Sequence, residues 1–209
     1  MKQVNKEHYD IKYLSKPRMM SYWYQIHELL KLNTNSLLEI GVGDKIFASY
    51  IKNNTKISYK SLDVDEQLNP DFLGSVKDIK LPEKFDTVCA FEVLEHLPFE
   101  DLPMCLENIN NMSTKSVLIS LPYYGPYFRI AFRLPIVGEF TFLLKIKWFK
   151  PKHEFNGQHH WEIGKKNYDL NTVRSIIGSV FKIKNEFLIK ENPYHYFFIS
   201  QAILFSSSL

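Results

Sequence analysis

Short apolar runs alternate along this chain with segments whose apolar residues recur every three or four positions. The runs predict buried strands, and the helical spacing predicts amphipathic helices. The predicted strands cover residues 36–40, 57–62, 71–74, 85–91, 115–122, 181–190 and 194–205. The predicted helices cover residues 18–32, 46–51, 98–112 and 171–180.

The order of these elements predicts the fold class. Strands and helices alternate up to residue 122, which predicts a mostly parallel sheet covered on both faces. The last two strands are joined only by Glu191-Asn192-Pro193, which favours an antiparallel pair. We therefore expect an α/β fold with a doubly wound, mostly parallel seven-stranded sheet and an antiparallel C-terminal hairpin. Residues 1–209 are expected to form a single domain.

Composition and charge narrow the class of protein. Hydrophobic residues make up 45% of the chain and charged residues 23%, as in ordinary globular proteins. A net charge of +3 is too small to indicate a nucleic-acid partner. The sequence contains no apolar segment that is both free of charges and long enough to predict a membrane span. The two cysteines and the absence of a signal peptide predict reduced thiols and a cytoplasmic location.

A glycine turn follows the first predicted strand, in the stretch Glu39-Ile40-Gly41-Val42-Gly43. Glycines at two positions let the backbone approach a ligand closely, because they carry no Cβ. The amides at the start of the next helix favour a negatively charged group. This turn therefore predicts a cradle for a nucleotide-like ligand.

An acidic residue, Asp63, ends the second predicted strand about twenty residues beyond the glycines. A carboxylate at that place can accept hydrogen bonds from both hydroxyls of a ribose. Asp65 is the alternative for this role. A solvated acidic turn without a ligand is the other interpretation.

Polar side chains also follow the central strand predicted at residues 85–91. The stretch Phe91-Glu92-Val93-Leu94-Glu95-His96 places three of them directly after it. Ligands of open α/β sheets bind at the carboxyl ends of the strands. These side chains are therefore expected to face a ligand.

The glycine turn and this second stretch together resemble the first and fourth motifs of class I S-adenosylmethionine-dependent methyltransferases. The resemblance spans about residues 36–122 and implies a Rossmann-like fold and S-adenosylmethionine as cofactor. The cofactor-binding residues that it implies are Glu39, Gly41, Gly43, Asp63, Ser75, Val76, Phe91 and Glu92.

Two positions depart from the motifs of that family. Ser75 stands where an acid usually binds the adenine amino group, so the Ser75 hydroxyl and amides near Val76 are expected to take over. Lys45 stands where a third glycine is usual. It either pairs with the cofactor carboxylate or narrows the turn. Lysine is permitted there if it already belongs to the helix and has ordinary helical angles.

A long insertion, residues 123–166, separates the fifth strand from the C-terminal elements and is expected to act as a substrate-side lid. Its part from Tyr127 to Lys150 mixes aromatic and basic residues and has one acid, Glu139. Such a stretch can lie on an anionic membrane surface, which would make the protein peripheral to a membrane, or can meet a lipid-linked or phosphorylated substrate. The alternative is a lid whose aromatic side chains pack on the sheet and whose cations are solvated.

Histidines gather in the same insertion, at His153, His159 and His160. Histidine is the natural base for removing a proton from a hydroxyl acceptor near neutral pH. The catalytic candidates are therefore His159, His160 and His96, the first two being preferred because they lie in the insertion. For each one, a hydrogen-bonded loop histidine is the alternative.

A metal site is a further alternative for these residues. Glu92, Glu95 and His96 with a later loop histidine, His159, resemble the metal site of small-RNA 3′-terminal 2′-O-methyltransferases and some quinone-biosynthesis O-methyltransferases. Such ligands suit a divalent ion that binds two vicinal hydroxyls. The same motif also occurs in methyltransferases without a metal.

The resemblance therefore implies an S-adenosylmethionine-dependent enzyme that methylates an oxygen or nitrogen of a small molecule. The layout resembles bacterial methyltransferases found among surface-polysaccharide genes, which suggests a sugar or a lipid-linked glycan precursor as acceptor. One alternative is a metal-assisted O-methyltransferase acting on a vicinal diol of a ribose or catechol. Another is a non-catalytic binding protein with the same fold. The sequence leaves the oligomeric state open.

Overall fold

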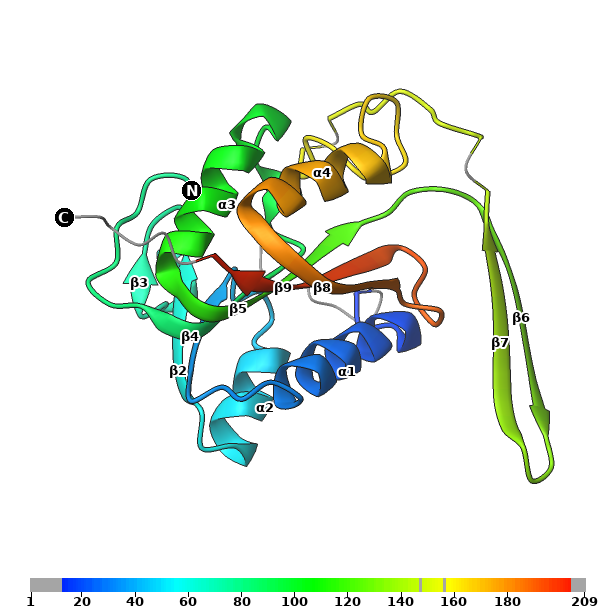
Figure 1. Ribbon diagram of the computed structural model, residues 1–209, viewed down its shortest axis with the longest axis horizontal. Helices are drawn as coiled ribbons and strands as arrows, with labels where there is room; N and C mark the ends of the chain where they lie inside the picture. The colour runs from blue at the N-terminus through cyan, green and yellow to red at the C-terminus, as the bar shows by residue number, and fades with distance from the viewer. Residues whose placement is uncertain (1–12, 147, 156, 204–209) are drawn as a thin grey trace.

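The computed structural model describes residues 13–146, 148–155 and 157–203 (Figure 1). Its elements are α1 (Lys16–Leu30), β1 (Ser36–Ile40), α2 (Ile46–Asn54), β2 (Ser58–Asp63), η2 (Glu66–Leu68), β3 (Phe72–Leu73), β4 (Phe85–Phe91), η3 (Leu94–His96), η4 (Phe99–Asp101), α3 (Leu102–Met112), β5 (Ser113–Pro122), β6 (Tyr127–Leu134), β7 (Gly138–Lys145), α4 (Leu170–Val180), β8 (Phe181–Leu188) and β9 (His195–Ala202).

Seven strands form the main sheet in the order β3-β2-β1-β4-β5-β9-β8. Neighbours from β3 to β5 pair in parallel, whereas β9 runs antiparallel to both β5 and β8. The predicted fold class, including the antiparallel C-terminal pair, is confirmed. In the register of the sheet, Ile40 pairs with Leu62 on one side and Ala90 on the other. The carboxyl ends of β1, β2 and β4 therefore meet at one edge.

Helices cover both faces of this sheet, α1 and α2 on one face and α3 and α4 on the other (Figure 1). Successive strand residues point to opposite faces, so neighbours in sequence enter different cores. Leu37 packs in the core that contains Phe47 of α2, and Leu38 packs in the core that contains Leu106 of α3. Both strand residues are fully buried. Because both faces of the sheet are covered, side chains on both faces of a strand are buried. This explains the continuous apolar runs in the sequence.

The predicted helix at 98–112 is shorter than expected, since α3 begins at Leu102 after the short η4 turn. Pro103 explains this boundary. It has no backbone N–H to donate four residues back, and its ring would clash with the carbonyl of residue 99 in a continuous helix. The strand predicted at 194–205 begins at His195 and ends at Ala202. Leu204 and Phe205 lie outside the described residues.

Strands β6 and β7 form a second, two-stranded sheet that projects from the body of the molecule (Figure 1). The sequence prediction placed no strand here. Every residue of β6 is exposed, and so is Phe142 of β7. The alternative that the aromatic side chains of this segment pack on the main sheet is therefore wrong for the hairpin. No helix among the described residues is long and apolar enough to cross a membrane.

Candidate functional site

A cleft of about 270 Å³ opens at the carboxyl ends of β1, β2 and β4. The eight residues predicted to bind a cofactor, spread between positions 39 and 92 of the sequence, all line it. They are Glu39, Gly41, Gly43, Asp63, Ser75, Val76, Phe91 and Glu92. His96 and His159 line the same cleft. The fold therefore assembles into one place side chains that the sequence offered as separate motifs.

The glycine turn is held by Asp63 at the end of β2. One carboxylate oxygen of Asp63 accepts a hydrogen bond from the Val42 amide at 2.8 Å, and the other accepts one from the Asp65 amide at 2.9 Å. Gly41 has a φ of +79°, and a Cβ there would lie 2.4 Å from Cγ2 of Val93. Only glycine fits this position without displacing Val93. Asp63 therefore fixes the turn in addition to facing the cleft.

Lys45 departs from its expected conformation. Its φ of 65° and ψ of 14° are left-handed, and it is the N-cap outside α2, so the condition of ordinary helical angles is not met. The reason is local, because the Lys45 amide donates to the Val42 carbonyl at 3.1 Å and closes a tight turn. Asp44 then accepts hydrogen bonds from the Ile46 amide at 3.1 Å and from the Tyr22 hydroxyl at 2.6 Å. Asp44 therefore ties α1 to the turn.

Glu39 is 4% exposed and accepts a hydrogen bond from the Tyr59 hydroxyl. Burial raises the pKa of its carboxyl to about 8. Ser75 uses its hydroxyl to accept a hydrogen bond from the Lys77 amide at 3.2 Å. Val76 is 3% exposed, and its carbonyl accepts from Asn108 at 3.0 Å. Ser75 and Val76 thus lie on the cleft wall. The Ser75 hydroxyl, which was expected to bind the adenine, already accepts a hydrogen bond from the protein.

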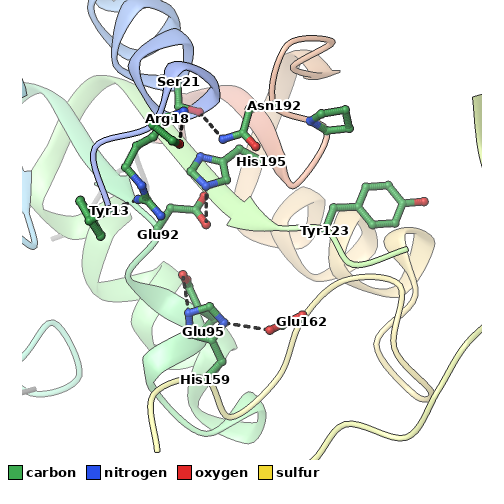
Figure 2. A network of polar contacts seen from close by, with 12 residues as sticks. Tyr13, Arg18, Ser21, Glu92, Glu95, Tyr123, His159, Glu162, Asn192 and His195 are labelled. Carbon is green, nitrogen blue, oxygen red and sulfur yellow. Dashed lines mark hydrogen bonds and ion pairs between the residues drawn. The ribbon is translucent and has the colours of Figure 1, made fainter. Parts of the chain in front are cut away.

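Glu92 directly follows β4 and has a φ of 55°, which is uncommon for a residue with a side chain. Its Oε2 atom lies 3.6 Å from Nε2 of His195, as Figure 2 shows. Burial raises the pKa of the Glu92 carboxyl to about 8 and lowers the pKa of His195 to about 3. Both groups are therefore largely neutral at pH 7.

His159 lies between two carboxyl groups (Figure 2). Its Nδ1 is 3.0 Å from Oε1 of Glu162, and its Nε2 is 3.9 Å from Oε1 of Glu95. Burial raises the pKa of Glu95 well above its usual range. Burial also acts to raise the pKa of Glu162, but hydrogen bonds from His159 and Tyr194 outweigh it and hold that pKa below its usual value. An ionised Glu162 thus orients the imidazole.

The three catalytic candidates are not equivalent. His96 has Nδ1 at 3.0 Å from the Gln158 carbonyl, and its ring centroid is 5.0 Å from that of His159. Burial lowers the pKa of His96. His160 is not among the lining residues, and its ring packs on Phe155 at 4.5 Å. The structure therefore brings His96 and His159 together at the cleft and leaves the His160 side chain beside it.

Three of the four residues in the metal alternative also come together. Glu95, His96 and His159 each offer one ligand atom, and these atoms lie within 4.8 Å of one another. Neither carboxylate oxygen of Glu95, which is fully buried, accepts a hydrogen bond from another described residue. Glu92 stands outside this group, beside His195.

Several cleft residues were missed by the sequence analysis. Arg18, Tyr22 and Gln25 of α1 line the cleft, as does His195 of β9. No motif marked them, because their residue types are ordinary for an amphipathic helix or a strand, and only the folded chain brings them to the cleft. Glu162, the partner of His159, was also missed. Its position three residues after His159 is the signal that could have found it.

The sequence profile of a protein family described as a methyltransferase domain matches residues 18–169. A search of curated protein sequences gave no match.

Solved structures resemble the chain over most of its length. One is an S-adenosylmethionine-dependent methyltransferase from Clostridium acetobutylicum, 7% identical, covering 93% of this chain and 95% of that chain with a TM-score of 0.60. Another is the N-methyltransferase NodS from Bradyrhizobium japonicum in complex with S-adenosyl-L-homocysteine, 12% identical, covering 96% and 94% with a TM-score of 0.57. A third is the magnesium protoporphyrin IX methyltransferase of Synechocystis with bound SAM, 16% identical, covering 97% and 86% with a TM-score of 0.57. At these identities the likeness shows a shared fold.

Proposed function

The chain belongs to the methyltransferase family that its residues 18–169 match, and we propose that it transfers a methyl group from S-adenosylmethionine to an oxygen or nitrogen of a small molecule. The observation that carries this proposal is the gathering of all eight expected cofactor residues on one cleft. Structural neighbours that bind S-adenosylmethionine or S-adenosyl-L-homocysteine support the choice of cofactor.

The residues that line the cleft suit the groups of this cofactor. Gly41 and Gly43 carry no side chain, so a ligand can approach the backbone at these two positions. Asp63 lies on the cleft with a carboxylate already oriented by two amides, as a ribose-binding acid needs to be. Oε1 of Glu92 is buried and accepts no hydrogen bond from a described residue, which leaves it available for a ligand donor. When bound, S-adenosylmethionine supplies an electrophilic methyl group on its sulfonium.

His159 is our candidate for the general base. An ionised Glu162 accepts a hydrogen bond from Nδ1–H of His159, which makes Nε2 the basic ring atom on the side of Glu95 and the cleft. When the acceptor's oxygen or nitrogen bonds to the methyl carbon, the bond from that carbon to the sulfonium sulfur breaks and its electron pair stays on sulfur. The acceptor atom also gives up a proton, and His159 is placed to take it. Residues 123–166, which supply His159 and Gln158 to the cleft, act in this proposal as the substrate-side insertion.

A sugar or a lipid-linked glycan precursor is the acceptor that we propose. The cleft wall is rich in hydrogen-bonding side chains, including Arg18, Gln25 and Gln158, which suits a polyhydroxylated acceptor. The hairpin exposes apolar side chains, and its last residue, Lys145, donates to the Pro193 carbonyl next to the cleft residues Tyr194 and His195. This arrangement suits an acceptor carried on a lipid.

The first experiment is calorimetric titration of the purified protein with S-adenosylmethionine. We expect micromolar binding that Asp63→Ala weakens about 10- to 100-fold, because a charged hydrogen-bonding group that also holds the turn is removed. Asp78→Ala is the matched control, since Asp78 is exposed and is not among the residues that line the cleft. No heat at millimolar cofactor would contradict the proposal.

The second experiment tests the base. Release of S-adenosyl-L-homocysteine is measured against a panel of nucleotide sugars and polyprenyl-linked sugars. With an accepted substrate, His159→Ala is expected to lower kcat about 100-fold or more while leaving cofactor affinity unchanged. His160→Ala serves as the control, because that side chain stands outside the cleft. Equal losses in both variants would remove His159 from the mechanism.

A second candidate function is metal-assisted O-methylation of a vicinal diol, favoured by the grouping of Glu95, His96 and His159. The Nδ1 atoms of both histidines face acceptor oxygens, an arrangement that orients metal-ligating imidazoles. A bound divalent ion would lower the pKa of a coordinated hydroxyl. Here Mn²⁺ titration should give a binding heat that Glu95→Gln abolishes and Glu92→Gln keeps. A protein that binds no Mn²⁺ and is insensitive to chelator excludes this candidate.

A further inference from the structure

The β6–β7 hairpin has one wholly apolar face. Paired residues of two antiparallel strands point to the same side, so the register assigns each side chain to a face. One face carries only Phe128, Ile130, Phe132, Leu134, Phe140, Phe142 and Leu144. These side chains are between 42% and 56% exposed. No part of the described chain covers this face.

The tip of the hairpin continues the apolar surface. Ile136 is 107% exposed and Val137 is 64% exposed, in the turn between β6 and β7. A solvent-facing turn normally carries polar residues, because exposed apolar side chains gain nothing from folding. The apolar tip and the apolar face together therefore indicate a surface that contacts an apolar partner and not water.

The opposite face and the base of the hairpin are basic. Arg129 and Arg133 lie on the opposite face, where the only acid of the segment, Glu139, pairs across the strands with Arg133. Lys150 and Lys152 follow the hairpin in sequence. An element with an apolar face and flanking cations has the charge pattern of polypeptides that bind anionic membrane surfaces.

The root of the hairpin lies close to the cleft. Lys145, the last residue of β7, donates hydrogen bonds to the carbonyls of Tyr123 and Pro193. Pro193 directly precedes Tyr194 and His195, which line the cleft. A surface bound by the hairpin would thus lie near the place where an acceptor enters.

We propose that the apolar face and tip of the β6–β7 hairpin dock on an anionic lipid bilayer, with Arg129 and Arg133 at the level of the headgroups. Aromatic and aliphatic side chains then enter the acyl boundary, and long cationic side chains remain in the polar layer.

A second copy of the chain is a weaker occupant of this face. Its seven side chains expose roughly 600 Å² together, taking about 150–200 Å² for each large apolar side chain when fully exposed. A stable dimer of ordinary size buries about 800 Å² on each partner. Face-to-face pairing would also leave the cations and the separate tip unexplained, whereas a bilayer accommodates all three features.

The test is flotation of the full chain with vesicles. We expect binding to vesicles of equal parts phosphatidylglycerol and phosphatidylcholine, and at least tenfold weaker binding to phosphatidylcholine alone. The double variant Phe132→Ser with Phe140→Ser should lose at least tenfold in affinity for the anionic vesicles. Met104→Ser is the matched control, since Met104 is 40% exposed on α3, close to the 42% of Phe140.

The contribution of the arginines and the insertion of the hairpin tip into the bilayer are tested by separate variants. Arg129→Ala with Arg133→Ala should weaken binding to anionic vesicles and reduce its sensitivity to salt. Ile136→Trp should add a fluorescence signal that brominated lipids quench, relative to the tryptophans of the parent chain. Circular dichroism confirms that each variant is folded, as expected for side chains that contact no core.

Three outcomes would overturn the proposal. They are no flotation of the parent chain, equal flotation of the Phe132/Phe140 variant, and a dimer in solution that this variant converts to a monomer. The last outcome would assign the face to a second copy. Vesicle binding needs no methyl transfer, so this proposal and the proposed activity fail or stand independently.

Discussion

Strands β4 and β6 have similar apolar content and opposite surroundings. β4, with the sequence Phe85-Asp86-Thr87-Val88-Cys89-Ala90-Phe91, lies between β1 and β5 and is covered on both faces, so most of its residues are buried. β6 has β7 as its one neighbour, and all of its residues are exposed. Burial of an apolar strand is therefore decided by what pairs with it and covers it, and apolar content alone does not define a core.

The comparison is tested most strongly by matched truncations of phenylalanine. Phe198→Ala in the fully buried part of β9 should lower the free energy of unfolding by about 3–5 kcal/mol, because it leaves a cavity in the core. Phe132→Ala in β6 should change it by less than about 1 kcal/mol. Urea unfolding measures both. A comparable loss in the two variants would mean that the hairpin packs against the body in solution.

Two glycines with positive φ give the next largest effect. Gly41→Ala combines a left-handed φ with a Cβ placed 2.4 Å from Val93, and should cost about 2–3 kcal/mol in unfolding free energy and most of the cofactor affinity. Gly138→Ala in the hairpin meets no atom within 4 Å, so only the backbone strain at φ +103° remains, about 1 kcal/mol. Thermal melting and cofactor titration separate the two. Intact cofactor binding by Gly41→Ala would refute the role of the turn.

A third contrast concerns acids. The pKa of Glu39 is about 8 in the folded protein, above its ordinary value of 4.5. Between those pH values the unfolded chain holds fewer protons than the folded one, so stability falls as pH rises. Between pH 5 and pH 8, the free energy of unfolding should fall less in Glu39→Gln than in the parent. The difference should be at least about 1.4 kcal/mol, the equivalent of one pKa unit.

The matched control for this pH series is Glu139→Gln in the exposed hairpin, which should leave the pH profile of the parent unchanged. Urea midpoints at pH 5, 6, 7 and 8 provide the measurement. Parallel profiles for the parent and Glu39→Gln would show that Glu39 ionises freely in the folded state.

Removal of the β6–β7 hairpin is expected to have the smallest effect, a nearly unchanged affinity for S-adenosylmethionine. Replacing residues 128–144 by an Asn-Gly turn keeps Tyr127 and Lys145, which pair at the base. The dissociation constant for S-adenosylmethionine should stay within about twofold, since no residue of the hairpin lines the cleft. A tenfold loss in calorimetry would instead show that the hairpin closes over the cofactor.

The sequence predicted the parts of this molecule that follow local rules. Apolar runs located every strand of the main sheet, and the spacing of Gly41, Asp63 and Glu92 placed three distant residues on one cleft. These predictions succeeded because strand ends in a parallel sheet must meet at one edge.

Other features depend on tertiary context and were missed. The left-handed angle of Lys45 follows from its hydrogen bond to Val42, which no residue type announces. His195 reaches Glu92 only because β9 inserts beside β5. The β6–β7 hairpin was missed although Phe128, Ile130 and Phe132 alternate with polar or small residues. A helical period does not detect this alternation, which is the signature of a strand.

The place of β9 in the sheet has a consequence for biosynthesis. β9 follows β8 in the chain but lies between β5 and β8, so β8 has no sheet partner until β9 has been translated. A nascent polypeptide that has grown only to residue 190 already contains the glycine turn, Asp63 and Glu92, yet lacks the wall formed by Tyr194 and His195. The site is therefore completed late in translation, which delays the onset of activity until nearly all of the described chain has left the ribosome.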